Sequence, residues 1–102
     1  PELPPLPPRP PLFCAGCTHR NSYYAIKSIA DPDTYFANDI GCYTLGLLPP
    51  LSALHTCGCM GAGIGVAHGA DKAGDAERHV AVIGDSTFLH SGVTPLIDKL
   101  DD

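Results

Sequence analysis

The sequence predicts an α/β protein built on a parallel sheet. Residues 34–40 and 79–83 are short runs rich in β-branched or aromatic side chains, which is typical of buried strands. Between them, residues 60–73 are mostly small or apolar and lack proline, which favours a helix. The order strand, helix, strand predicts a βαβ unit with a right-handed crossover. At 102 residues the chain is short for a complete doubly wound domain, so we expect a fragment of a larger one.

Composition argues against two classes of partner. The net charge is −5, and the six lysines and arginines are scattered, so we expect no basic surface for nucleic acid. No basic segment precedes an apolar core, and the weakly polar residues 57–70 are too few and too rich in glycine to span a bilayer. We therefore expect a cytoplasmic protein without membrane contact.

The chain begins with a proline-rich segment. Seven of the first eleven residues are proline, which fixes φ and removes backbone donors, so we expect an extended polyproline II conformation. We interpret residues 1–12 as a linker between domains, and residues 13–102 as the amino-terminal part of the domain that follows. A ligand for a proline-recognition domain is the alternative. A linker at this position indicates a longer polypeptide.

One more helix and one loop are predicted around the first strand. Residues 18–30 lack glycine and proline and end at an Asp-Pro pair, which predicts a helix. Its apolar side carries Tyr23, Ile26 and Ala30. Residues 43–56 contain two consecutive prolines and show no period, so they predict a loop.

The helix predicted over residues 60–73 is unusual in its glycines. Gly61, Gly65 and Gly69 recur every four residues, although a glycine inside a helix costs about 1 kcal/mol relative to alanine. Something is therefore expected to lie close against this side of the helix. Tight packing on a strand or helix is the favoured interpretation, and direct contact with a cofactor is the alternative.

The second predicted strand ends at Gly84-Asp85-Ser86. Ligands bind at the carboxyl ends of the strands in open parallel sheets. Asp85 is therefore well placed to hold a cation together with a phosphate group. Ordinary turn chemistry is the competing interpretation of a Gly-Asp pair.

Five cysteines either precede predicted helices or follow predicted strands. The amino ends of helices and the carboxyl ends of strands share one edge of a parallel sheet, so we expect all five to converge near Asp85. Helix amino ends favour thiolates and phosphates alike. The spacing resembles that of metal ligands, with buried structural cysteines as the alternative. The five are Cys14, Cys17, Cys42, Cys57 and Cys59.

Four short motifs occur in order along the chain. They are Cys14-Ala-Gly-Cys-Thr-His-Arg20, Asp39-Ile-Gly-Cys-Tyr-Thr-Leu-Gly46, Thr56-Cys-Gly-Cys-Met-Gly-Ala-Gly-Ile-Gly-Val-Ala-His-Gly69 and Gly84-Asp-Ser-Thr-Phe-Leu-His-Ser-Gly92. Together they resemble the thiamine-diphosphate-binding domain of the alpha subunit of indolepyruvate ferredoxin oxidoreductases. The resemblance covers about residues 9–100, and the combination is specific although each motif alone is common. It implies a partial thiamine-diphosphate-binding fold.

The resemblance implies a site for thiamine diphosphate and Mg²⁺. In the wider 2-oxoacid ferredoxin oxidoreductases, a Gly-Asp turn holds the Mg²⁺ that bridges the cofactor's diphosphate, and the matching residue is Asp85. Gly84 precedes it in the turn, while Ser86 and Thr87 would offer N–H and hydroxyl groups to the phosphate oxygens. The second protein ligand of the metal is expected beyond Asp102.

Three further residues are candidates at the same edge. Cys59 and Met60, at the start of the glycine-rich helix, could line the thiazolium side of the cofactor. His90, just past the Gly-Asp turn, could act on the substrate. A packing or turn role is the alternative for each.

The same relatives hold a proximal [4Fe-4S] cluster on a Cys-x-x-Cys pair, a later Ile-Gly-Cys and a distant fourth cysteine. Cys14, Cys17 and Cys42 match the first three. The fourth ligand is then either absent or supplied by Cys57 or Cys59. Zn²⁺ on the same thiolates is the competing interpretation.

The implied reaction is the oxidative decarboxylation of an arylpyruvate such as indolepyruvate to an acyl-CoA. Coenzyme A and ferredoxin are then co-substrate and electron acceptor, and a beta subunit is a partner. A non-redox thiamine-dependent decarboxylase and a small metal-binding or electron-transfer module are the alternatives. In this family the carboxylate that activates the cofactor comes from a separate domain, so we expect the isolated 102-residue piece to be inactive.

Overall fold

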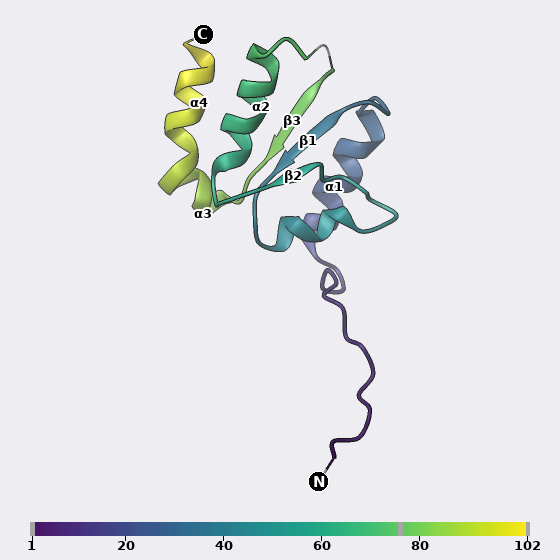
Figure 1. Ribbon diagram of the computed structural model, residues 1–102. Helices are drawn as coiled ribbons and strands as arrows, with labels where there is room; N and C mark the ends of the chain where they lie inside the picture. Colours follow the sequence, from purple (N-terminus) through teal and green to yellow (C-terminus); the bar gives the residue numbers. More distant parts are fainter. Residues whose placement is uncertain (1, 76, 102) are drawn as a thin grey trace.

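A three-stranded parallel sheet forms the centre of the protein (Figure 1). The structure is a computed structural model that describes residues 2–75 and 77–101. The strands are β1 (Tyr35–Asn38), β2 (Thr56–Cys57) and β3 (His79–Val82), in the order β2-β1-β3. β1 lies in the middle and pairs in parallel with both neighbours. The predicted α/β class and parallel sheet are confirmed.

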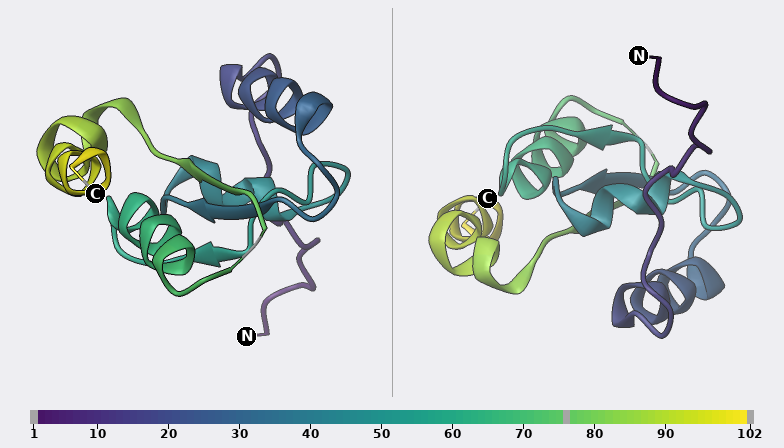
Figure 2. Two further views of the ribbon diagram at one scale, coloured as in Figure 1. Left: turned by 90° about the horizontal axis from the view of Figure 1, so that it is seen from above. Right: turned by 90° about the horizontal axis from the view of Figure 1, so that it is seen from below.

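Helices cover both faces of this sheet. Figure 2 shows α1 on one side of the sheet and α2 on the other, with α4 beside α2. The chain from Asp85 to Leu100 is helical throughout, and it includes one π-helical turn between α3 and α4. The helices are α1 (Thr18–Ile29), the 3-10 helix η1 (Cys42–Leu47), α2 (Ala62–Lys72), α3 (Asp85–Thr87), the π-helix η2 (Phe88–Gly92) and α4 (Val93–Leu100).

The loop predicted over residues 43–56 is wrong at both of its ends. The 3-10 helix η1 occupies the beginning, and Thr56 pairs with Ala37 as part of β2. A strand of two residues is too short to show the alternation that identifies strands in a sequence. Its place in the sheet depends on β1, which lies about twenty residues earlier in the chain.

The core is centred on Tyr23 of α1, which is fully buried and clusters with the buried Phe36 and Val82. Its hydroxyl donates to the carbonyl oxygen of Tyr43 and accepts a hydrogen bond from Asn38 Nδ2 at 2.7 Å. Burial raises the pKa of the Tyr23 phenol well above its ordinary value, although the Asn38 hydrogen bond acts in the opposite direction. The neutral phenol therefore joins α1, the end of β1 and η1.

The close approach predicted for the glycine-rich helix occurs at Gly61, just before α2 begins, and at Gly63 within α2. A Cβ on Gly63 would lie 2.7 Å from the carbonyl oxygen of Ala37, so α2 packs directly on the backbone of β1. Among the described residues, nothing lies within 4 Å of a Cβ placed on Gly65 or Gly69. Of the three glycines in the four-residue repeat, Gly61 is therefore the one with a close neighbour in the described chain.

The proline-rich segment carries no secondary structure, and residues 2–12 are exposed. It runs away from the body of the molecule (Figure 1). Phe13, the next residue, is partly buried against the core. The linker role of this segment stays a prediction.

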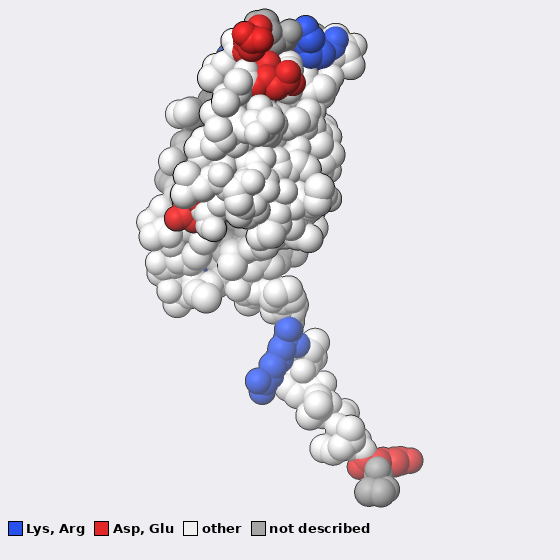
Figure 3. All heavy atoms as spheres, turned by 90° about the vertical axis from the view of Figure 1, so that its left-hand side faces the viewer, with Lys and Arg blue, Asp and Glu red and all other residues white. Residues whose placement is uncertain are grey.

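The outer face of α4 is poor in charge. Figure 3 shows acidic groups gathered at one end of this side and few charged groups across its middle. Exposed apolar side chains follow one another along it at spacings of three or four residues, namely Leu89, Val93, Ile97 and Leu100. None of the described helices is long and apolar enough to cross a bilayer.

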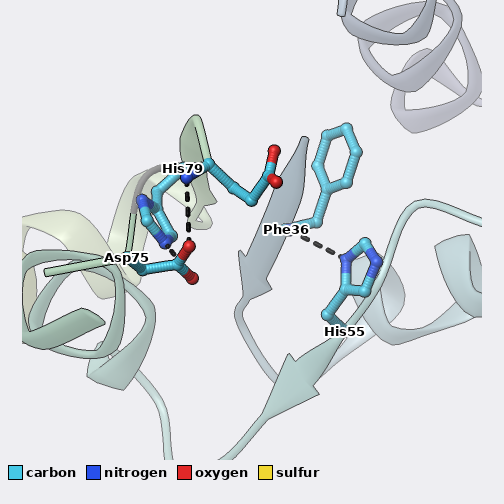
Figure 4. Close-up of polar contacts among 5 residues, drawn as sticks. Phe36, His55, Asp75 and His79 are labelled. Carbon is cyan, nitrogen blue, oxygen red and sulfur yellow. Dashed lines mark hydrogen bonds and ion pairs between the residues drawn. The ribbon is translucent and has the colours of Figure 1, made fainter. Parts of the chain in front are cut away.

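Side chains from the loops cover the amino ends of the strands (Figure 4). Asp75 follows α2, and its Oδ2 lies 3.2 Å from His79 Nε2. Its Oδ1 accepts a hydrogen bond from the backbone N–H of Glu77. The Glu77 N–H, and then His79, lower the pKa of Asp75. These contacts tie the connection between α2 and β3 to the first residue of β3.

His55 extends the pairing of β1 and β2 by one residue. Its Nδ1 accepts a hydrogen bond of 2.9 Å from the backbone N–H of Phe36 (Figure 4). The backbone N–H of His55 donates to the Phe36 carbonyl oxygen. The ring also stacks on Tyr35, with the ring centroids 5.0 Å apart. A side chain therefore replaces a strand carbonyl as the partner of a backbone donor in β1.

We expect His55→Ala to lower the free energy of unfolding by about 1 kcal/mol, because the Phe36 N–H loses its acceptor. His55→Asn is the matched control, because its Oδ1 can accept the same hydrogen bond while the stacking on Tyr35 is lost. Urea unfolding followed by circular dichroism measures both. Equal losses in the two variants would show that stacking, and not the hydrogen bond, carries the stability.

Candidate functional site

The candidate site lies at the edge of the sheet where the strands end. Because all three strands are parallel, the residues after Asn38, Cys57 and Val82 share this edge. The amino ends of α1, α2 and α3 face the same way (Figure 1). The N–H groups in the first turn of a helix have no carbonyl partner within it, so this edge is rich in available donors.

Asp85 is the first residue of α3 and is exposed. Its Oδ1 accepts a hydrogen bond of 2.8 Å from the N–H of Ser86, and that is the one hydrogen bond of this carboxylate among the described residues. Ser86 is also exposed, whereas Thr87 is 4% exposed. Asp85 and Ser86 therefore present oxygen atoms to solvent, while the Thr87 side chain packs inside.

Asp39 connects this turn to the beginning of α2. It directly follows β1 and is 3% exposed. Its Oδ1 accepts a hydrogen bond of 3.0 Å from the N–H of Gly61, and its Oδ2 accepts one of 3.3 Å from the N–H of Gly84. One buried carboxylate thus joins two loops that are more than twenty residues apart in the chain.

The loop before α2 presents Cys59 and Met60 beside this junction. Both are exposed, Met60 at 54%. The next residue, Gly61, has a left-handed φ of 88°, and a Cβ placed on it would lie 2.7 Å from the Cβ of Ser91. Gly61 thus fixes the loop that carries Cys59 and Met60, because it bonds to Asp39 and packs closely against Ser91.

His90 lies in the π-helical turn that follows α3. It is exposed, and its Nδ1 is 2.5 Å from Ser91 Oγ. Such turns are frequent at functional sites, because they alter the direction in which side chains leave a helix. A role for His90 on the substrate stays a prediction.

The cysteines share this edge of the sheet but do not form a metal centre. The described residues contain no group of three or more His, Cys, Asp or Glu side chains arranged to hold a metal ion. Cys17 Sγ lies 3.1 Å from His19 Nδ1, and Cys57 Sγ lies 3.5 Å from Thr44 Oγ1. The arrangement of Cys14, Cys17 and Cys42 therefore does not fit a [4Fe-4S] cluster.

A Mg²⁺ bound together with a diphosphate fits the Gly84–Ser86 turn better. Asp85 supplies a hard carboxylate oxygen, Ser86 supplies a hydroxyl, and the first turn of α3 supplies N–H groups. Two cavities, of about 630 and 540 Å³, lie elsewhere in the molecule, and no residue of this turn lines them. Asp85, Ser86, Cys59 and Met60 are all exposed at the candidate site.

An exposed carboxylate and a helix start, both at the carboxyl edge of a parallel sheet, are features that suit a phosphate group and a hard cation in α/β domains. Residues 39–99 match the family model for the C-terminal thiamine-pyrophosphate-binding domain of thiamine pyrophosphate enzymes. The chain belongs to this family. Thiamine pyrophosphate is the same compound as thiamine diphosphate, so the family predicted from the four motifs is confirmed.

Individual relatives are similar in sequence to most of this chain. Indolepyruvate oxidoreductase subunit IorA of Pyrococcus horikoshii is 46% identical over 93% of this chain and 17% of its own length. The subunits of the same name from Archaeoglobus fulgidus and Methanothermobacter marburgensis are each 47% identical, over 92% and 97% of this chain. The chain spans 15–17% of the length of these relatives. No solved structure matches it.

Proposed function

We propose that this chain binds the diphosphate and Mg²⁺ of thiamine diphosphate in an indolepyruvate ferredoxin oxidoreductase. The observation that carries the proposal is the Gly84–Ser86 turn, with its exposed carboxylate, joined through Asp39 to the loop before α2. The similarity to subunits named for indolepyruvate supports an arylpyruvate as the substrate. Coenzyme A, ferredoxin and a second subunit complete the proposed reaction.

In this proposal the residues of the chain bind and orient. Asp85 ligates Mg²⁺, while Ser86 and the first N–H groups of α3 receive phosphate oxygens. When bound, thiamine diphosphate supplies the electron sink for loss of the substrate carboxylate as CO₂. Cys59 and Met60 border the cofactor from the loop before α2, and Gly61 holds that loop in place.

The five cysteines support a reducing compartment, because all of them are free. This favours the cytoplasm as the place where the enzyme works. The [4Fe-4S] cluster that the sequence predicts on Cys14, Cys17 and Cys42 is left out of this proposal, because the described residues show no group of side chains arranged to hold it. Comparing the iron and sulfide content of the full-length protein with that of Cys17→Ser tests it.

The proposed function is tested with the full-length chain and its partner subunit. We expect bound thiamine diphosphate after gel filtration in Mg²⁺, and dye reduction that requires both indolepyruvate and coenzyme A. Release of CO₂ without an electron acceptor would favour the non-redox decarboxylase instead. Absence of cofactor binding would leave the small binding or electron-transfer module as the better interpretation.

A further inference from the structure

Asp39 is a buried carboxylate that the proposed cofactor chemistry does not use. It is 3% exposed, and both of its oxygens accept backbone hydrogen bonds, one from each loop of the candidate site. Its backbone N–H donates to the carbonyl oxygen of Val82 at 2.9 Å, so the residue is fixed at the ends of β1 and β3. The carboxylate therefore projects from a rigid part of the sheet.

The chemistry of this position requires two acceptors. Gly61 and Gly84 each direct an N–H at a different oxygen of the same side chain. An ionised carboxylate accepts at both oxygens, whereas an amide has one acceptor and one donor group. Asparagine has nearly the same shape, but it would leave a buried N–H facing another donor.

The two glycines lie next to the residues of the candidate site. Gly61 follows Cys59 and Met60, and Gly84 precedes Asp85. A shift of either loop would change the separation of the surfaces that face the cofactor. The carboxylate of Asp39 is the described side chain that bonds to both loops.

We propose that Asp39 is a positioning residue that locks the Gly61 loop and the Gly84 turn into one preformed surface for thiamine diphosphate and Mg²⁺. This inference rests on the proposed function. Asp39 acts through the two loops and touches neither the metal nor the cofactor. Preorganised loops bind more tightly because they lose less conformational freedom on binding.

The test uses Asp39→Asn in the full-length chain, with Asp33→Asn as the matched control in the exposed turn before β1. At saturating Mg²⁺, we expect the Kd for thiamine diphosphate to rise about tenfold or more in Asp39→Asn, because a hydrogen bond to a charged group is lost. Amide hydrogen exchange without cofactor should quicken in peptides that contain Gly61 and Gly84. Asp33→Asn should change neither quantity.

A second variant removes the contact from its donor side. Gly84 has φ −71° and ψ 153°, which proline can adopt, and Gly84→Pro deletes the N–H and places its ring Cδ against Asp39 Oδ2, which separates the turn from Asp39. We expect the same rise in Kd, with faster exchange confined to the Gly84 turn. This variant tests the inference even if Asp39→Asn does not fold.

The outcomes separate this inference from the proposed function. An unchanged Kd in the folded Asp39→Asn protein, with a lowered thermal midpoint, would reduce Asp39 to a structural role and overturn the inference. Unchanged exchange at both loops would also overturn it. If the wild-type protein binds no thiamine diphosphate, the proposed function fails, and the positioning role falls with it.

Discussion

Asp85→Ala is expected to abolish retention of thiamine diphosphate by the full-length protein. The carboxylate is exposed beyond the end of β3, and its one hydrogen bond among the described residues comes from the N–H of Ser86. Removing this carboxylate should therefore change the stability of the local fold very little. We expect the affinity for the cofactor in Mg²⁺ to fall roughly 100-fold, because a charged ligand is lost.

Gel filtration followed by quantification of bound thiamine diphosphate measures the effect. Asp33→Ala is a suitable control, because it removes an exposed aspartate in the turn before β1. Thermal unfolding of both variants without cofactor should match that of the wild type. Full retention by Asp85→Ala would remove this residue from the metal site.

The sequence indicated those parts of the fold that depend on local pattern. The apolar run before Gly84 becomes β3, and the Gly-Asp turn follows at the carboxyl edge, as parallel topology requires. β2 was missed because two residues carry no period. The role of Asp39 was missed because it depends on Gly61 and Gly84, which lie 22 and 45 residues away. An aspartate directly after a buried strand was the signal that could have found it.

The expected convergence of the cysteines failed for a spatial reason. Cys14 and Cys17 precede α1, whereas Cys57 and Cys59 precede α2. These helices lie on opposite faces of the sheet, so the two helix starts lie on opposite sides of it (Figure 2). Sharing an edge of the sheet is therefore not the same as sharing a coordination sphere, and sequence order alone does not distinguish the two.

Alanine substitutions at the glycines of α2 are expected to have opposite effects on stability, depending on what each glycine faces. Gly63→Ala should lower the free energy of unfolding by about 2–3 kcal/mol, because its Cβ would lie 2.7 Å from the Ala37 carbonyl oxygen. Backbone atoms of β1 can give way only if the strand or α2 moves. Such a movement would also displace Gly61 at the start of α2, so cofactor binding should weaken together with stability.

Gly65→Ala and Gly69→Ala are the matched controls on the same helix. Nothing in the described chain lies within 4 Å of a Cβ at either position. The change should therefore stabilise the protein by up to about 1 kcal/mol, because alanine is the better helix former. Urea unfolding of the three variants measures the contrast. A loss at Gly63 no larger than at the other two would mean that α2 does not press on β1. A loss at Gly65 or Gly69 in the full-length protein, but not in the 102-residue chain, would locate a contact with another part of the enzyme on that face of α2.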